Sequence, residues 1–280
     1  AALIFTCAFS AYADEFILSV DKGDDAYFAT LLEAALNAAD GEHIFSTYTY
    51  DRSIPQSRIL RAMLAGDAPV NVLFTGHSIQ REQLLKQIDI PLLRGLLGYR
   101  LLAIHKDSAD HLAPLNTLKE LTHNIRLGSG TSWPDTYILR AAGFKIETGT
   151  VDNLWRMLHR RRFDALPMGI NEIYGELARF KQSTPSSDLM IEQSIMLHYR
   201  FDHFFYVAPH DQRRALIIEQ GLERLYANGE FMRIFNEAPS IKAAIAEAKK
   251  YKRTIIEIEN PLNSDRVSAI PSKYWHSFED

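Results

Sequence analysis

The sequence predicts an α/β protein of two lobes, each a mixed sheet flanked by helices, with the second lobe inserted into the first. Two observations lead to this fold class. Short apolar runs of strand length alternate with segments whose apolar residues repeat at the period of a helix, the pattern of a parallel α/β sheet. The pattern also occurs as two successive sets, and 280 residues are enough for one or two domains.

The first set of elements begins with a buried strand at residues 16–20, followed by a helix. The apolar side chains of that helix recur three and four positions apart: Phe28, Leu31, Leu32, Ala35 and Leu36. A strand at 43–50 and a helix at 55–65 come next, and Gly66 stands where a helix commonly ends. A third strand at 70–74 completes the set.

The second set begins with a strand at 99–104. Its further elements are a strand at 125–128, a helix that opens at Pro134, a strand at 144–147, a helix at 151–161 and a short strand at 164–167. Strands near 190–191 and at 204–207 then return the chain to the first lobe, and a long amphipathic helix follows at 212–226.

This order of elements predicts the division of the chain into lobes. We expect residues 14–100 and 204–280 to form lobe 1 and residues 101–203 to form lobe 2. The tail at 241–280 alternates between helical and loop-like segments, and we expect it to pack back onto lobe 1.

The first thirteen residues have the features of the end of a secretory signal peptide. They carry no charge and stop at Asp14, and the small residues Ala11 and Ala13 flank Tyr12 as a signal peptidase requires. We therefore interpret residues 1–13 as the remnant of a signal peptide, which predicts an exported, periplasmic protein that starts at Asp14. A buried apolar strand is the alternative. A lipoprotein site at Cys7 is disfavoured because bulky residues precede it.

Composition excludes several classes of function. Cys7 is the only cysteine, so cleavage after Ala13 leaves a chain without disulfides, thiolate nucleophiles or cysteine metal ligands. The formal net charge is −4, which argues against a nucleic-acid partner because such proteins are usually basic. No cofactor is indicated, and we expect a monomer.

Several local motifs, in their order and spacing, resemble the type II periplasmic solute-binding proteins. The motifs are LRAMLAG at 60–66, TGHS at 75–78, LKEL at 118–121, IRLGSGT at 125–131, LWRMLHRRRFDA at 154–165 and LYANGEF at 225–231. The chain is similar in particular to family 3, which includes the amino-acid receptors of ABC importers, and the resemblance covers most of residues 14–280. Residues 93–100, 132–136 and 171–173 look like a divergent branch of that family.

The resemblance implies a ligand cleft between the lobes, lined by loops at the carboxyl ends of strands. One such loop is residues 128–135, where Ser129, Thr131, Ser132 and Trp133 are candidate ligand contacts. Its glycines permit a close approach of the backbone, and Pro134 suits the first turn of a helix, so the amides near Thr131 and Ser132 would bind an anion. The alternative is that Ser132 only caps the helix and Trp133 belongs to the core.

The remaining candidates lie at other strand ends. Thr75 and Ser78 follow the third strand, and their hydroxyls suit polar ligand atoms. The resembled receptors hold the ligand carboxylate with an arginine about five residues beyond the position of Ser78, where this chain has Gln83. Arg81 or Arg100 would then supply that cation, and a solvated position for Arg81 remains open.

The amine-binding acid of the resembled receptors should stand near Gly169 and is also absent. Glu172 would replace it, with Asn171 as a second polar group. These departures speak against an ordinary α-amino acid as the ligand.

These observations favour a non-enzymatic receptor that captures a small polar, anionic or zwitterionic ligand for ABC-type uptake, with a permease or a membrane sensor as partner. One alternative is a periplasmic sensor or interaction protein of the same fold. Another is an enzyme of the dehydratase or lyase type, for which Glu172 and His77 are the only acid and base pair that we identify. A metal site at His105, Asp107, Asp110 and His111 is a weaker interpretation.

Overall fold

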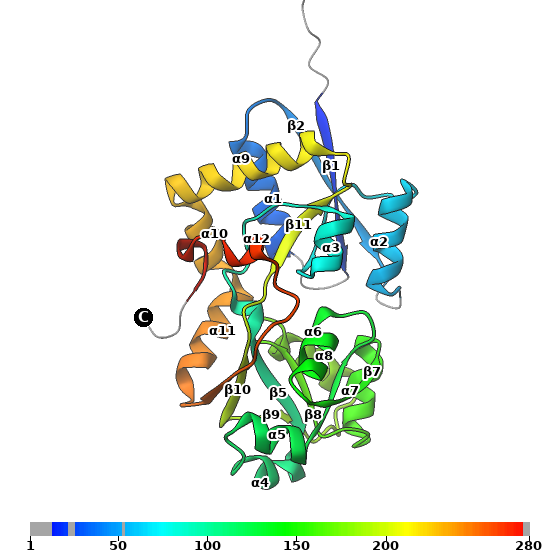
Figure 1. The fold of residues 1–280 in the computed structure, drawn as a ribbon, viewed down its shortest axis with the longest axis vertical. Coiled ribbons are helices and arrows are strands. Elements are labelled where there is room, and N and C mark those ends of the chain that lie inside the picture. The colour runs from blue at the N-terminus through cyan, green and yellow to red at the C-terminus, as the bar shows by residue number, and fades with distance from the viewer. Residues whose placement is uncertain (1–12, 22–25, 52–53, 277–280) are drawn as a thin grey trace, which may run out of the picture.

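The computed structural model of the chain describes residues 13–21, 26–51 and 54–276. Twelve of the thirteen residues of the predicted signal peptide, 1–12, lie outside these ranges. Figure 1 shows an elongated molecule of two bodies stacked along its longest axis. In the described ranges, no helix has both the length and the apolar character that crossing a membrane requires.

Lobe 1 is the upper body in Figure 1 and is built from both halves of the chain. Its first elements are β1 (Asp14–Asp21), α1 (Ala26–Ala38), β2 (His43–Tyr50), α2 (Gln56–Ala65), β3 (Leu73–Gly76), α3 (Ile79–Leu84) and β4 (Lys86–Gln87). Its later elements are β11 (His203–Val207), α9 (Gln212–Asn228) and α10 (Glu230–Glu237).

The strands of lobe 1 form two small sheets that lie next to each other. β1 and β2 pair in parallel, and β11 lies between β3 and β4, antiparallel to both. An isolated bridge from Leu18 to Val72 joins the two sheets just before β3. The third strand begins at Leu73, later than residue 70, where its apolar run predicts the start. Helix α1 packs against α9 at Gly221, where a Cβ atom would lie only 2.0 Å from the carbonyl oxygen of Ala35.

Lobe 2 is the lower body in Figure 1. Its strands and helices are, in chain order, β5 (Tyr99–His105), α4 (Ala109–Leu112), α5 (Leu118–Asn124), β6 (Arg126–Gly130), α6 (Pro134–Ala141), β7 (Lys145–Gly149), α7 (Val151–His159), β8 (Ala165–Gly169), α8 (Ile173–Ser183), β9 (Leu189–Ile191) and β10 (Ile195–His198). Its strands, together with β12 (Thr254–Glu257) from the tail of the chain, form a mixed sheet in the order β12-β10-β5-β8-β6-β7, and β9 pairs with β5.

The tail departs from the expected division into lobes. Helix α11 (Pro239–Lys250) leads from α10 to the edge of lobe 2, and β12 (Thr254–Glu257) pairs in parallel with β10 of the lobe 2 sheet. Only the following part, with α12 (Asp265–Ser268), returns to lobe 1. The assignment of all of residues 204–280 to lobe 1 is therefore wrong for β12, because the edge of β10 supplies backbone partners for this short apolar strand.

The chain crosses between the lobes just before β5 and again between β10 and β11. These two crossing segments touch each other at Gly98, where a Cβ atom would lie 2.1 Å from the carbonyl oxygen of Tyr199. The amide of Tyr199 also donates a hydrogen bond to the carbonyl of Gly98, at 3.2 Å. The absence of a side chain at Gly98 thus allows the two crossings to run in contact.

Candidate ligand-binding site

A cavity of about 520 Å³ lies between the two lobes, within the size range of small-molecule sites. Eight of the ten predicted site residues line it: Thr75, Arg81, Arg100, Thr131, Ser132, Trp133, Asn171 and Glu172. They come from the end of β3, from the loops after β6 and β8, from α3 and from β5. The carboxyl ends of the strands thus meet at one cavity, as the strand order indicates.

Ser78 and Ser129 do not line the cavity but support its walls. The Ser78 hydroxyl accepts the backbone N–H of Arg81 at 3.2 Å and caps α3. The Ser129 hydroxyl accepts a hydrogen bond from the hydroxyl of Thr136 at 2.8 Å, at the start of α6. The role of these two serines in the structure is to fix the helices that carry cavity residues.

Arg81 is a buried cation whose hydrogen-bond partners are all neutral in the part of the chain that the structure describes. Its guanidinium donates to the Thr75 hydroxyl, to the Gly76 carbonyl at 2.7 Å and to the Gln56 side-chain oxygen at 2.7 Å. It also reaches across the cavity to the carbonyl of Ser132 in lobe 2, at 3.2 Å. Burial lowers the pKa of Arg81 to about 10, so it stays protonated at neutral pH. The solvated position that the sequence left open is excluded, because Arg81 is only 6% exposed.

Arg100 lies in the same cavity, but its charge is already compensated. Its guanidinium is 2.5 Å from a carboxylate oxygen of Asp135, which also accepts a hydrogen bond from the Tyr199 hydroxyl at 2.5 Å. Burial alone would lower the pKa of Arg100, but Asp135, Tyr199 and Glu172 together outweigh burial, so the pKa is raised. Of the two arginines proposed from the sequence, Arg81 is therefore the one without a carboxylate partner among the described residues.

Asn171 and Glu172 place two acceptor oxygens next to each other beside the cavity. A Cβ atom on Gly169 would lie 2.9 Å from Oδ1 of Asn171 and 3.1 Å from Oε2 of Glu172. Oδ1 of Asn171 is buried and has no hydrogen-bond donor among the described residues. The Arg100 guanidinium lies 3.8 Å from the Glu172 carboxylate, and burial raises the pKa of Glu172 to about 7 although Arg100 opposes that rise.

The loop at 128–135 contributes to the site differently from the sequence prediction. The amide of Thr131 donates to the carbonyl of Gly149 at 3.1 Å, so it is not free for a ligand. Asp135 also occupies the first turn of α6, and a carboxylate there disfavours a second anion at the same helix end. The expectation of an anion is therefore corrected for the Thr131 amide. Trp133 folds over Gly130, where a Cβ atom would lie 2.2 Å from the indole ring.

Sequence reasoning missed several residues of the cavity. Phe28 and Phe74 stack with ring centroids 3.9 Å apart on its lobe 1 side, and Phe201 of the second crossing and His203 at the start of β11 also line it. The strand and helix periodicities assign Phe28 and Phe74 to the core, and no local motif distinguishes Phe201 or His203. Asp135 could have been identified as an acid in the first turn of a helix, but its pairing with Arg100 spans 35 positions of the chain.

The structure does not bring together the acid and base proposed for an enzyme. His77 is fully buried outside the cavity, where Nδ1 contacts Oε1 of Gln87 at 2.8 Å, and burial lowers its pKa. The pairing of His77 with Glu172 is therefore wrong.

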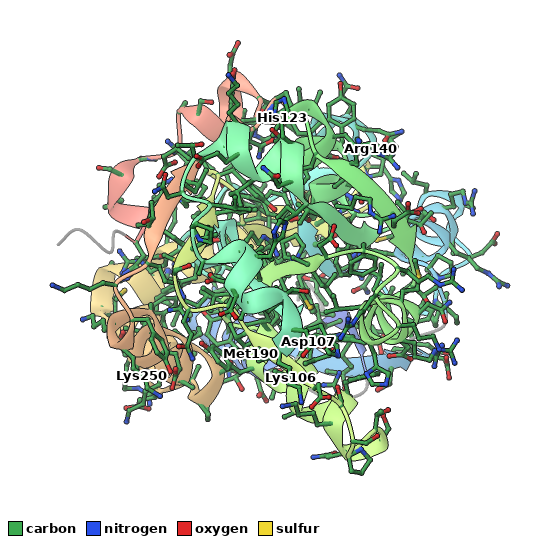
Figure 2. All side chains as sticks on the ribbon, turned by 90° about the horizontal axis from the view of Figure 1, so that it is seen from below. Lys106, Asp107, His123, Arg140, Met190 and Lys250 are labelled. Carbon is green, nitrogen blue, oxygen red and sulfur yellow. The ribbon has the colours of Figure 1, made fainter. Side chains whose placement is uncertain are left out.

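The cluster at residues 105–111 lies at the outer end of lobe 2, where Figure 2 shows Lys106 and Asp107. Nδ1 of His105 contacts the Arg161 guanidinium at 3.2 Å, and that guanidinium also bonds Asp107. Within the described ranges, no group of three or more histidine, cysteine, aspartate or glutamate residues is placed to hold a metal ion.

Solved structures of similar fold cover most of this chain. A histidine kinase sensor domain with similarity to periplasmic binding proteins has a TM-score of 0.58 at 14% identity, over 81% of this chain and 96% of its own. The substrate-binding protein of an amino acid ABC transporter has a TM-score of 0.56 at 12% identity, over 80% and 99%. The chain has the type II periplasmic-binding-protein fold. The two-lobe fold class and the resemblance read from the sequence motifs are thus confirmed at the level of fold.

A third structure of this fold is an ancestral amino-acid-binding protein that is a precursor of cyclohexadienyl dehydratase. Its TM-score is 0.56 at 11% identity, over 80% of this chain and 95% of its own. No family model matches the sequence, and no curated protein sequence matches it. At these identities the neighbours show the fold alone, so the ligand has to be inferred from the cavity itself.

Proposed function

We propose that this chain is an exported solute-binding protein that captures a small polar ligand between its lobes and holds the anionic group of that ligand with Arg81. One observation carries the proposal. Arg81 lies in the cavity, is 6% exposed and has only neutral oxygen partners among the described residues. A buried charge without an opposite charge is costly, so an anion in the cavity has more to gain at Arg81 than at Arg100.

The position of Arg81 also connects ligand binding to lobe closure. Arg81 belongs to lobe 1, and its contact with the Ser132 carbonyl is a hydrogen bond to lobe 2. A ligand anion that binds Arg81 while its other end contacts lobe 2 favours the closed arrangement, because those contacts form fully only when the lobes meet.

The acceptor oxygens of Asn171 and Glu172 suit the other end of the ligand. An unpartnered buried acceptor is stabilised by a donor such as an ammonium, hydroxyl or amide group. A ligand with an anion at Arg81 and a donor at Asn171 matches the cavity, and a zwitterion fits this description. Phe28, Phe74 and Trp133 supply apolar surface around the ligand body.

Delivery of the ligand to an ABC permease is the role that we favour. The fold is shared with the substrate-binding protein of an amino acid ABC transporter, and residues 1–13 indicate export. A histidine kinase sensor domain also shares this fold, so a membrane signalling protein is the second candidate for the partner of this chain. An enzymatic role has one observation in its favour, because Glu172 with a pKa of about 7 is a proton donor at the cavity.

A thermal-shift screen tests the proposal. The probes are the twenty L-amino acids, succinate, 2-oxoglutarate and lactate, together with native mass spectrometry of freshly purified protein to detect a retained small molecule. Arg81→Gln removes the charge, Arg81→Lys keeps it without the planar fork, and Arg140→Gln is the control, since Arg140 lies exposed on the outer surface of lobe 2 (Figure 2).

We expect an anionic or zwitterionic probe to stabilise the wild type and Arg140→Gln but not Arg81→Gln. The loss of a buried charge partner costs about 2–5 kcal/mol, which is roughly 30-fold to several thousand-fold in affinity. Binding that is unchanged in Arg81→Gln contradicts the proposal. Conversion of the bound probe, followed by NMR, would favour the enzymatic role.

A further inference from the structure

The tail from residue 258 to residue 276 runs from the edge of lobe 2 back to lobe 1, and we call it the strap. It is a third passage between the lobes, beside the crossing before β5 and the one between β10 and β11. Figure 1 shows it returning from β12 to α12, next to these crossings. Its contacts fall into three groups, one at each lobe and one at the crossing.

The lobe 2 end of the strap is fixed by backbone pairing. β12 pairs with β10 over four residues, and the amide of Ile258 extends this ladder to the carbonyl of His198 at 2.8 Å. The His198 ring stacks on Tyr99 of β5, with centroids 4.1 Å apart. This end of the strap therefore moves with the lobe 2 sheet.

The lobe 1 end is fixed to α3 and to the segment just after it. The Ser264 hydroxyl donates to the Glu82 carboxylate at 2.5 Å, and Glu82 follows Arg81 directly in α3. The Arg266 guanidinium pairs with Asp89 and also donates to the carbonyl of Gln87 at 3.1 Å. The helix that carries Arg81 is thus held by the strap.

Between its two ends the strap forms hydrogen bonds with Arg200 of the second crossing. The side-chain amides of Asn260 and Asn263 both donate to the Arg200 carbonyl, at 3.0 and 3.1 Å. The Arg200 guanidinium in turn donates to the carbonyl of Ile270 at 3.1 Å and lies 4.3 Å from the centre of the Trp275 ring. A rotation of one lobe against the other changes the backbone at such a crossing, so it must also strain these contacts.

We propose that the strap limits how far the lobes separate, and that Ser264 and Arg266 are positioning residues that hold α3, and with it Arg81, in place against the cavity. The limit on opening follows from the two fixed ends and needs no ligand. The positioning of Arg81 for an anion rests on the proposed function.

The experiment measures the opening of the lobes directly. Cys7 is replaced by serine, and spin labels are attached at Arg61→Cys in α2 and Arg156→Cys in α7, two exposed positions on different lobes. Pulsed electron resonance then gives the distribution of distances between the labels without any ligand. The parent is compared with Ser264→Ala, with Arg266→Gln and with the double variant.

Arg224→Gln is the matched control for Arg266→Gln. Arg224 also pairs with a carboxylate, that of Asp40, and donates to a backbone carbonyl, that of Ala38 at 2.8 Å, but both partners lie within lobe 1. The control therefore removes the same kinds of contact without touching the strap.

We expect the double variant to show at least a threefold larger weight of long distances than the parent, and Arg224→Gln to match the parent. Urea unfolding is measured in parallel. A double variant that is less stable but keeps the parental distances has lost only packing, and this result overturns the proposal. Because these distances need no ligand, a failed probe screen leaves this test intact.

If a probe binds through Arg81, the double variant should bind it at least threefold more weakly than Arg224→Gln does. Equal affinities would overturn the positioning role of Ser264 and Arg266.

Discussion

Replacing Asp202 with asparagine tests whether a buried carboxylate holds the two crossings together. Asp202 is fully buried directly before β11, and its oxygens accept backbone N–H groups from three residues. The donors are Leu93 at 3.2 Å, His203 at 2.6 Å and Gly95. Leu93 and Gly95 precede the first crossing and His203 follows the second, so one side chain joins both.

The size of the effect follows from counting acceptors. Asparagine keeps one oxygen and puts an NH₂ group in place of the other. Whichever way the amide turns, either the N–H of Gly95 or the N–H of His203 loses its acceptor and faces another donor. An unsatisfied buried donor costs about 1–3 kcal/mol, and a hydrogen bond to a charged group contributes about 1.5–3 kcal/mol. Relief of the desolvation of the charge offsets part of this, so we expect a loss of about 2 kcal/mol.

Urea unfolding at pH 7.5, followed by circular dichroism and by tryptophan fluorescence, measures the loss. The control is Asp67→Asn, because Asp67 is exposed in the loop after α2. We expect the control to stay within about 0.5 kcal/mol of the wild type. If Asp202→Asn is no more destabilising than the control, the three amides do not depend on the carboxylate and the reasoning is refuted.

Three further predictions concern the walls of the cavity. Gly130→Ala forces a Cβ atom against the ring of Trp133, so the tryptophan emission should shift and stability should fall by about 1–3 kcal/mol, whereas an unchanged spectrum would contradict the close approach. Tyr199→Phe leaves Asp135 without its hydroxyl donor and should cost about 1–2 kcal/mol in urea unfolding, and no loss would show that this bond is not formed. The folded-state pKa of Glu172 is raised from 4.5 to about 7, so its contribution to stability is complete below pH 4.5 and is lost as the pH rises through 7. The stability of the wild type should therefore fall relative to that of Glu172→Gln over this range, and parallel pH profiles would refute the raised pKa.

Local patterns were sufficient for most of the fold. The apolar spacing predicts α1 as it stands in the structure, and Gly66 ends α2 with a positive φ of 76°. Such signals need only neighbouring residues, because helix periodicity and helix ends are set within a few positions. The strand β12 was missed because four residues with a single buried side chain carry no information about the strand they pair with.

The candidate site could be predicted as a set of loops but not as a set of contacts. The predicted strand ends indicate that Thr75, Thr131 and Asn171 lie close together, because the order of strands in the sheets determines which strand ends are neighbours. Whether Arg81 or Arg100 is available depends on Asp135, which is remote from both in sequence, and the same holds for the Gly149 carbonyl that occupies the Thr131 amide. These pairings are properties of the packed lobes.

The central claim is that Arg81 binds the anionic group of a ligand between the lobes, and a double-mutant cycle between protein and ligand tests it most directly. Calorimetric titration gives the Kd of wild type and Arg81→Gln for the best probe of the screen and for the primary amide of its carboxylate. We expect the amide to bind the wild type at least 30-fold more weakly than the acid does, and Arg81→Gln to bind both about equally, a coupling of about 2 kcal/mol or more. An equal loss of affinity for the amide in both proteins would show that the anion binds elsewhere.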